Sequence, residues 1–166
     1  MAIPSLKRLM NMIRYMIVSI CALIFSMSGA YAQTPIEKLI DKYADVRGAR
    51  DLIASGAEMR IARSLIRRTP LASIAPEVQV LEVLKMQNAS RNDILMFERD
   101  LKEALETYEY YGQTEGANGM VDIYISKKSA DTIDELVLYN PEIYSLNSLK
   151  GTFSVSELVS IDKGSK

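Results

Sequence analysis

The chain of 166 residues contains no histidine and no tryptophan, and its single cysteine, Cys21, lies in an apolar run near the N-terminus. Without histidine there is no imidazole to act as a base near neutral pH or to bind zinc or haem. Beyond Cys21 there is no thiol either, which excludes disulfides, thiolate metal sites and cysteine nucleophiles. We therefore predict no catalytic residue, no metal, no cofactor, and a fold held together by packing.

The first 32 residues have the composition of a secretory signal peptide. Basic residues precede an uncharged apolar run, YMIVSICALIF at residues 15–25, and small residues follow it, with an A-x-A pattern at Ala30 and Ala32. This order is typical of a signal peptide, and the run is too short to span a bilayer comfortably. We predict cleavage after Ala32, so that the mature chain begins at Gln33 and has no transmembrane span.

Two alternatives remain open in this segment. Acylation of Cys21, as in a lipoprotein, competes with cleavage at Ala32, although only Ala32 has the A-x-A pattern. The true start is Met1, Met10 or Met12. We expect an exported protein of the periplasm or outer envelope of a Gram-negative bacterium.

The mature chain is expected to form one domain, residues 33–161, with a frayed tail at residues 162–166. Residues 1–32 hold three of the twenty basic residues and none of the twenty-one acidic ones, so the mature chain carries four more acidic than basic residues. A net acidic surface is poorly suited to bind nucleic acid or an anionic membrane. We therefore expect no nucleic-acid partner.

Local capping signals predict three helices. In a capping box, an N-cap hydroxyl and a glutamate three residues later satisfy each other's backbone N–H groups. The three predicted starts are Thr34 with Glu37, Ser90 with Asp93, and Ser154 with Glu157. Gly48 is expected to end the helix that begins at Thr34, because glycine readily adopts the left-handed conformation that follows a helix.

Between these helices the chain has the alternation or the β-branched composition of strands. Turn residues at 116–119 and 140–142 connect consecutive strands, which favours antiparallel pairing. We predict an α+β fold with a single antiparallel sheet and helices packed on one face. Residues 50–55 are compatible with a strand or with the first turns of a helix. The predicted strands are residues 78–86, 108–113, 121–125, 136–139 and 143–149.

Two stretches, DELVL at residues 134–138 and LKGTFSVSEL at residues 149–158, follow a long helix at residues 91–108. Together with the charged helix before Gly48, they resemble the exported bacterial "domain of unknown function 4252" family. The likeness covers nearly all of the mature chain. It implies an exported, non-enzymatic α+β protein, and it transfers no catalytic residue and no ligand.

Two groups of side chains are candidates for binding. Arg60, Arg63 and Arg67 are three and four residues apart, so one helix face carries all of them and offers an anion site for an acidic protein or an anionic glycan. The alternative is a solvated helix face. Tyrosines are concentrated near the strands, and an aromatic binding surface and simple cross-strand packing both explain them. The candidate surface tyrosines are Tyr110, Tyr124 and Tyr139.

Two further motifs involve single side chains. Asp122 and Glu135 lie on neighbouring predicted strands, where they pair for acid–base chemistry in a carboxylate-only hydrolase or remain ordinary exposed acids. Asp131-Thr132-Ile133 resembles an O-glycosylation acceptor of some Gram-negative bacteria, with Thr132 as the modified residue.

The expected function is therefore that of an exported, non-catalytic envelope protein that binds or regulates another envelope protein. A glycan- or anion-binding module is the alternative, and a carboxylate-only hydrolase is a remote one. A contiguous exposed apolar patch on the sheet favours the protein partner. A pocket that gathers tyrosine hydroxyls and arginines favours the ligand. Two buried carboxylates facing each other across a cleft favour the hydrolase.

Overall fold

The computed structural model describes residues 33–158; the predictions for Ala30, Ala32, Cys21, the start site and the tail fall outside this range. The α-helices are α2 (Pro35–Ala44), α3 (Met59–Ile66) and α4 (Arg91–Ala104). The strands are β1 (Arg50–Ser55), β2 (Val78–Lys85), β3 (Glu109–Gly116), β4 (Gly119–Ser129), β5 (Thr132–Asn140) and β6 (Ser145–Ser154). Short 3-10 helices are η1 (Gly56–Glu58), η2 (Pro70–Ser73), η3 (Ala75–Glu77) and η4 (Leu105–Thr107).

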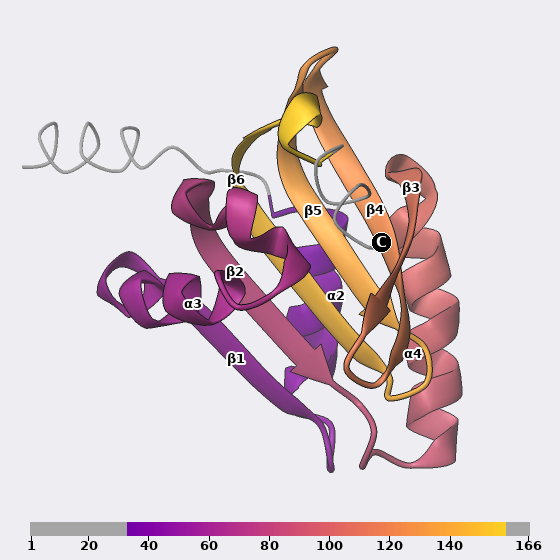
Figure 1. The fold of residues 1–166 in the computed structure, drawn as a ribbon. Coiled ribbons are helices and arrows are strands. Elements are labelled where there is room, and N and C mark those ends of the chain that lie inside the picture. Colours follow the sequence, from indigo (N-terminus) through magenta and orange to yellow (C-terminus); the bar gives the residue numbers. More distant parts are fainter. Residues whose placement is uncertain (1–32, 159–166) are drawn as a thin grey trace, which may run out of the picture. The chain divides into compact units, whose positions relative to one another are not determined.

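The strands form one antiparallel sheet in the order β1-β2-β6-β5-β4-β3 (Figure 1). The last four strands follow one another as hairpins, and β6 then pairs with β2, which the chain had completed before α4. The α+β class and the single antiparallel sheet are thus confirmed.

Helices cover both faces of this sheet, which corrects the expectation that they pack on one face. Figure 1 shows α2 and α4 behind the sheet and α3 with η2 and η3 in front of it. We call these the α2–α4 face and the α3 face. Leu136 and Val137 are adjacent on β5 and point to opposite faces, yet both are fully buried and belong to separate apolar clusters. A strand that is apolar on both sides needs cover on both.

The core of the α2–α4 face is built around an aromatic residue of α4. Phe97 is fully buried, and its ring meets that of Tyr43 edge-on at 5.4 Å between centroids. It also lies 6.2 Å from the ring of Tyr139 on β5. Residues of α2, α4 and the strands all belong to this cluster, so the two helices pack against each other and against the sheet.

The predicted capping signals are confirmed at the starts of α2 and α4 and of the helical turn at residues 155–158. Thr34 Oγ1 accepts a hydrogen bond from the Glu37 N–H at 3.2 Å, and the Thr34 N–H donates to Glu37 Oε2 at 2.7 Å. Ser154 and Glu157 repeat the box with the same two distances. Ser90 caps α4. These contacts span three residues, so the local sequence is enough to encode them.

The structure corrects one local prediction and decides between the alternatives left open in another. Helix α2 ends at Ala44, four residues before Gly48, which instead lies in the turn into β1 with a φ of 91°. A Cβ on Gly48 would lie 2.0 Å from the Asn88 carbonyl oxygen, so a close backbone approach requires glycine here. Residues 50–55, left open between strand and helix, form β1. Gly56, with a φ of 52°, separates this strand from α3.

Candidate functional site

The α3 face is covered over only part of its width. Side chains that lie side by side across the strands form rows on this face. One row is almost entirely buried beneath α3 and its neighbours, and we call it the covered row. It consists of Ala54, Leu81, Leu149, Leu136 and Ile125.

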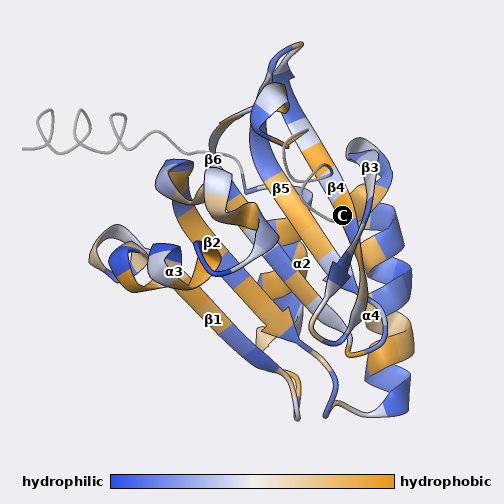
Figure 2. Cartoon of the chain, viewed as in Figure 1, coloured by the Kyte–Doolittle hydropathy of each residue, from blue (hydrophilic) through white to orange (hydrophobic). Residues whose placement is uncertain are grey.

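The next row on the same face, about 7 Å further along the strands, meets solvent over much of its length. Leu52 is 56% exposed at its β1 end, and the three residues beside it are half-buried. Four of its five side chains are apolar, and Figure 2 shows hydrophobic colour along much of β1 and β2. We call it the open row. It consists of Leu52, Val83, Asn147, Leu138 and Ile123.

Helix α3 adds a second apolar surface to this region. Ile61 and Leu65 are four residues apart on one flank of the helix and are 70% and 57% exposed. On the opposite flank, Arg63 Nε donates to the Val78 carbonyl oxygen at 2.9 Å, at the beginning of β2. Helix α3 crosses β1 and β2 (Figure 1), so its exposed side chains and the open row belong to the same face of the sheet. We call them together the apolar region of the α3 face.

A cavity of about 650 Å³ continues this region toward β3 and β4. Ile123, the last residue of the open row, and Leu136 line it together with Leu71 of η2. Its rim on β3 is polar and includes Tyr111 and Glu115. No arginine lines it, so it does not have the composition that favours an anion ligand.

The structure divides the predicted arginine face. Arg63 is half-buried and holds α3 to β2 through its bond to the Val78 carbonyl. Arg60 and Arg67 are exposed and form no ion pair with any residue between positions 33 and 158. Two of the three predicted residues are thus available to an external anion, while the third has a structural role.

The predicted tyrosine surface is divided in the same way. Tyr110 is 53% exposed and packs edge-on against Tyr124, its partner across β3 and β4, at 5.3 Å between ring centroids. Tyr139 belongs to the core beside Phe97 and is only 8% exposed, which corrects its assignment to the surface. Burial, followed by the neighbouring Glu98, raises the pKa of the Tyr139 hydroxyl. Only the Tyr110–Tyr124 pair remains as an aromatic surface.

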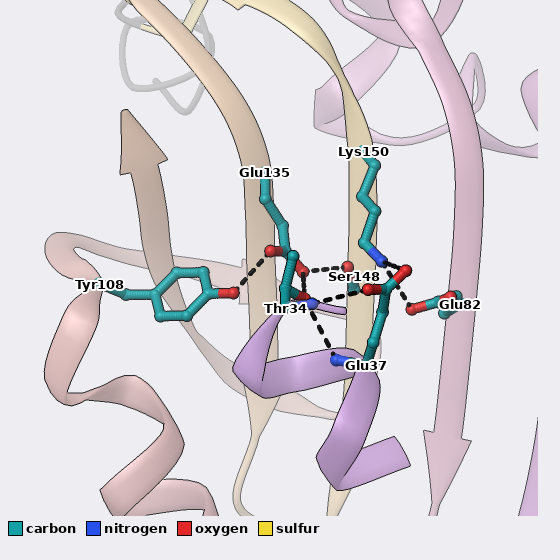
Figure 3. A network of polar contacts seen from close by, with 7 residues as sticks. All are labelled: Thr34, Glu37, Glu82, Tyr108, Glu135, Ser148 and Lys150. Atoms are coloured by element: carbon teal, nitrogen blue, oxygen red, sulfur yellow. Dashed lines mark hydrogen bonds and ion pairs between the residues drawn. The ribbon is translucent and has the colours of Figure 1, made fainter. Parts of the chain in front are cut away.

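A network of polar side chains lies beneath the N-terminus of α2 (Figure 3). At its centre, Glu135 of β5 is 2% exposed and accepts three hydroxyl hydrogen bonds. The Tyr108 hydroxyl donates to it at 2.5 Å, the Ser148 hydroxyl at 2.6 Å and the Thr34 hydroxyl at 3.4 Å. Burial and then the bond to Glu135 raise the pKa of Tyr108 far above its usual range, so its hydroxyl remains a donor.

The second half of the network is a lysine with two carboxylates. Lys150 of β6 forms ion pairs with Glu37 of α2 and with Glu82 of β2, the latter at 3.3 Å. Burial raises the pKa of Glu82, although Lys150 acts against it. Burial also acts to raise the pKa of Glu37, but the bonds from Lys150 and the Thr34 N–H outweigh it and the pKa is lowered.

This network connects α2 to β2, β5 and β6. None of Glu37, Glu82 and Glu135 lines the 650 Å³ cavity or the second one, of about 400 Å³, between α4 and the sheet. Every buried polar side-chain atom within residues 33–158 has a hydrogen-bond partner. A buried carboxylate with all its partners inside the fold serves to position the elements around it.

The pairing of Asp122 with Glu135 proposed for a hydrolase is wrong. Strand register places Asp122 opposite Tyr139, whereas Glu135 lies opposite Ser126, four residues away along β4. That separation is roughly 13 Å along the strand. Asp122 instead accepts a hydrogen bond from Gln113 of β3 at 2.7 Å.

Thr132, the predicted O-glycosylation site, is the first residue of β5 and follows the turn from β4. It is half-buried and pairs with Ser129 and Ser154 in the neighbouring strands, while Asp131 is exposed. The position is a hairpin end, and modification there remains a prediction.

Sequence reasoning did not identify the open row or the apolar flank of α3. One signal was present, because five of the eight residues of α3 are apolar while a buried helix face of this length needs about three. The surplus residues are Ile61 and Leu65. The open row itself is assembled from five different strands, so no contiguous segment of sequence contains it.

No group of three or more acidic side chains within the described range is arranged to hold a metal ion. None of the helices in that range is long and apolar enough to cross a membrane. Comparison of the chain with protein-family models, curated proteins and solved structures gives no match. The resemblance to the domain of unknown function 4252 family therefore remains a prediction.

Proposed function

We propose that this chain is an exported, non-catalytic protein that binds another protein of the bacterial envelope through its α3 face. The supporting observation is the apolar region made by the open row with Ile61 and Leu65. Burial of apolar surface is the main favourable term in protein association, and contiguous exposed apolar patches commonly mark interfaces. Leu52, Ile61 and Leu65 are its exposed apolar side chains, and apolar surface of this kind favours a protein partner over a charged ligand.

The binding role is favoured over hydrolysis by the position of the acids. Asp122 lines the 400 Å³ cavity without Glu135, and the buried Glu82 and Glu135 are held by partners within the fold and lie outside both cavities. A general acid or base must be within reach of a bound substrate.

The test compares two pairs of apolar residues on different helices. Ile61→Lys with Leu65→Lys places charges on the α3 flank, and Leu95→Lys with Met96→Lys does the same on α4. Leu65 and Leu95 are each 57% exposed, and Met96, at 40%, is less exposed than Ile61, at 70%. The α4 pair therefore controls for charge added to an exposed apolar helix surface. Purified wild type and both variants are immobilised, and proteins retained from the envelope fraction of the source bacterium are quantified by mass spectrometry.

A protein retained by the wild type and the α4 variant but lost by the α3 variant supports the proposal, provided that all three melt alike. Retention of the same proteins by all three contradicts it.

An anion-binding module is the second candidate, favoured by the exposure of Arg60 and Arg67 without carboxylate partners within residues 33–158. Arg60→Glu with Arg67→Glu should abolish binding to an immobilised acidic glycan while leaving the melt nearly unchanged. Added salt should weaken the same binding, because exposed charges are screened within about 8–10 Å at physiological ionic strength. Binding that survives both changes would exclude the arginines.

A further inference from the structure

The two edges of the sheet differ in how they discourage pairing with another strand. On β3, a bulge interrupts the register between Tyr110 and Gly112, and acidic residues stand at Glu109 and Glu115. Bulges and charges are common protections of sheet edges. Strand β1 pairs with β2 without any irregularity and contains no proline, glycine or lysine, and its two charged residues, Arg50 and Asp51, are both at its first end. Of the two edges, only that of β1 is suited to accept another strand.

The β1 edge is also apolar on both faces of the sheet. Leu52 projects on the α3 face and is 56% exposed, and its neighbour Ile53 projects on the α2–α4 face and is 49% exposed. An added strand would cover both side chains at once. A ligand bound only to the α3 face would leave Ile53 in water.

The residues of β1 are self-complementary in the antiparallel direction. From Asp51 to Ser55 they read polar, apolar, apolar, apolar, polar, so their polarity is symmetric about Ile53. If two copies pair about an axis through this residue, Ile53 meets Ile53, Leu52 meets Ala54, and Asp51 meets Ser55. Each pair then matches in polarity, which is what stabilises cross-strand neighbours.

Charge decides between the two possible directions. Parallel pairing in register would place Arg50 beside Arg50 and Asp51 beside Asp51 of the other copy, and like charges directly opposite destabilise a sheet. Antiparallel pairing about Ile53 separates these charges. It places each Arg50 opposite Gly56 of the other copy, where Glu58 follows two residues later.

We propose that two copies of this chain associate through β1, antiparallel about a two-fold axis at Ile53, to form one continuous sheet of twelve strands. The occupant of the edge is a second copy because β1 matches itself residue by residue. Such an axis is perpendicular to the sheet, so both α3 faces lie on the same side. This association does not rest on the proposed function, since it concerns the purified chain alone.

The first test measures self-association by sedimentation and native mass spectrometry over a range of concentrations. Ile53→Lys sets two charges opposite each other and should weaken dimerisation at least about tenfold, with little change in the melt. Tyr110→Lys, on the β3 edge and of similar exposure, is the control and should dimerise normally. A wild type that stays monomeric, or a dimer that survives Ile53→Lys, overturns the proposal.

The second test determines the register in which the two β1 strands pair. In a background with Cys21→Ser, the chain has no cysteine, and single cysteines are introduced as Ile53→Cys or Tyr110→Cys. Residues directly opposite have Cβ atoms about 4.5–5.5 Å apart, so Ile53→Cys should give a covalent dimer with a short bismaleimide and Tyr110→Cys should not. Equal cross-linking contradicts the pairing. If the wild type is monomeric and Ile53→Lys instead abolishes binding of an envelope protein, the β1 edge is the binding site of that protein and the proposal is overturned.

Discussion

The α2–α4 face and the α3 face of the sheet differ in what covers them. On the first, two helices bury a continuous apolar core around Phe97, and the polar network of Glu135 and Lys150 lies under the start of α2. On the second, α3, η2 and η3 also bury an apolar cluster, but they leave the open row, with Leu52 at its end, in contact with solvent. The same sheet thus has one face closed by its own helices and one face partly open.

This difference separates stability from recognition. Burying a leucine side chain contributes about 1.5–3 kcal/mol to folding, whereas an exposed leucine contributes little until a partner covers it. The α2–α4 face should therefore account for more of the folding free energy per apolar residue. The α3 face retains apolar surface whose burial is still available to drive association.

The largest expected effect comes from the same substitution made on each face. Leu101 of α4 is 3% exposed and Leu52 of β1 is 56% exposed. We expect Leu101→Ala to lower the free energy of unfolding by about 2–5 kcal/mol, and Leu52→Ala by about 0.5 kcal/mol or less. Denaturant melts measure both at a concentration where the chain is monomeric. Equal losses would mean that the α3 face is as closed as the other.

A smaller effect is expected where the polar network meets the core. Tyr108→Phe removes the hydroxyl that donates to the buried Glu135, and should cost about 1.5–3 kcal/mol because that bond is charge-assisted. The matched change two residues away, Tyr110→Phe, affects an exposed ring and should leave the melt unchanged. If Tyr108→Phe is also neutral, the network does not stabilise the closed face.

The smallest effect concerns acid. Lys42, then Tyr43 and Arg99, hold the pKa of Asp100 on α4 well below its ordinary value of 3.8. A lowered folded-state pKa contributes stability that is fully present above the unfolded value and is lost as pH falls below it. Glu82 has the opposite effect on stability. Burial raises its pKa above 4.5, so protonation of Glu82 favours the folded state.

The free energy of unfolding should therefore rise slightly as pH falls toward about 4.5, and then decrease below about 4. Asp100→Asn should remove part of the acid loss, by about 1 kcal/mol or less as expected for an ion pair near the surface. Glu82→Gln should flatten the rise. An acid profile unaffected by Asp100→Asn would exclude this residue as its origin.

Features encoded within a few residues were predictable from the sequence. The hydrogen bonds of the Thr34–Glu37 and Ser154–Glu157 boxes connect positions three apart, and both formed as expected. The alternation of Ile123 and Ile125 with polar residues indicated a strand, and they lie on the buried side of β4. Gly48 was misjudged because its role is a contact with Asn88, forty residues away.

The candidate site was much less predictable, because it depends on contacts between distant segments. Tyr110 and Tyr139 looked alike as tyrosines on strands, yet one is exposed on an edge strand and the other packs on Phe97. Arg63 could not be told from its neighbours until β2 placed the Val78 carbonyl beside it. Helix periodicity identifies which residues share a face but not what that face meets.

By itself, the sequence determined the class of fold, the helix starts and most strands, because hydrogen bonds between near neighbours and the two-residue period act locally. Tertiary structure alone decided which face of the sheet each helix covers and which apolar row stays open. It also brought Thr34 to Glu135 across 101 positions of sequence, and Lys150 to Glu82 across 68. Such contacts form only when the whole sheet assembles, since each strand contributes one or two residues to them.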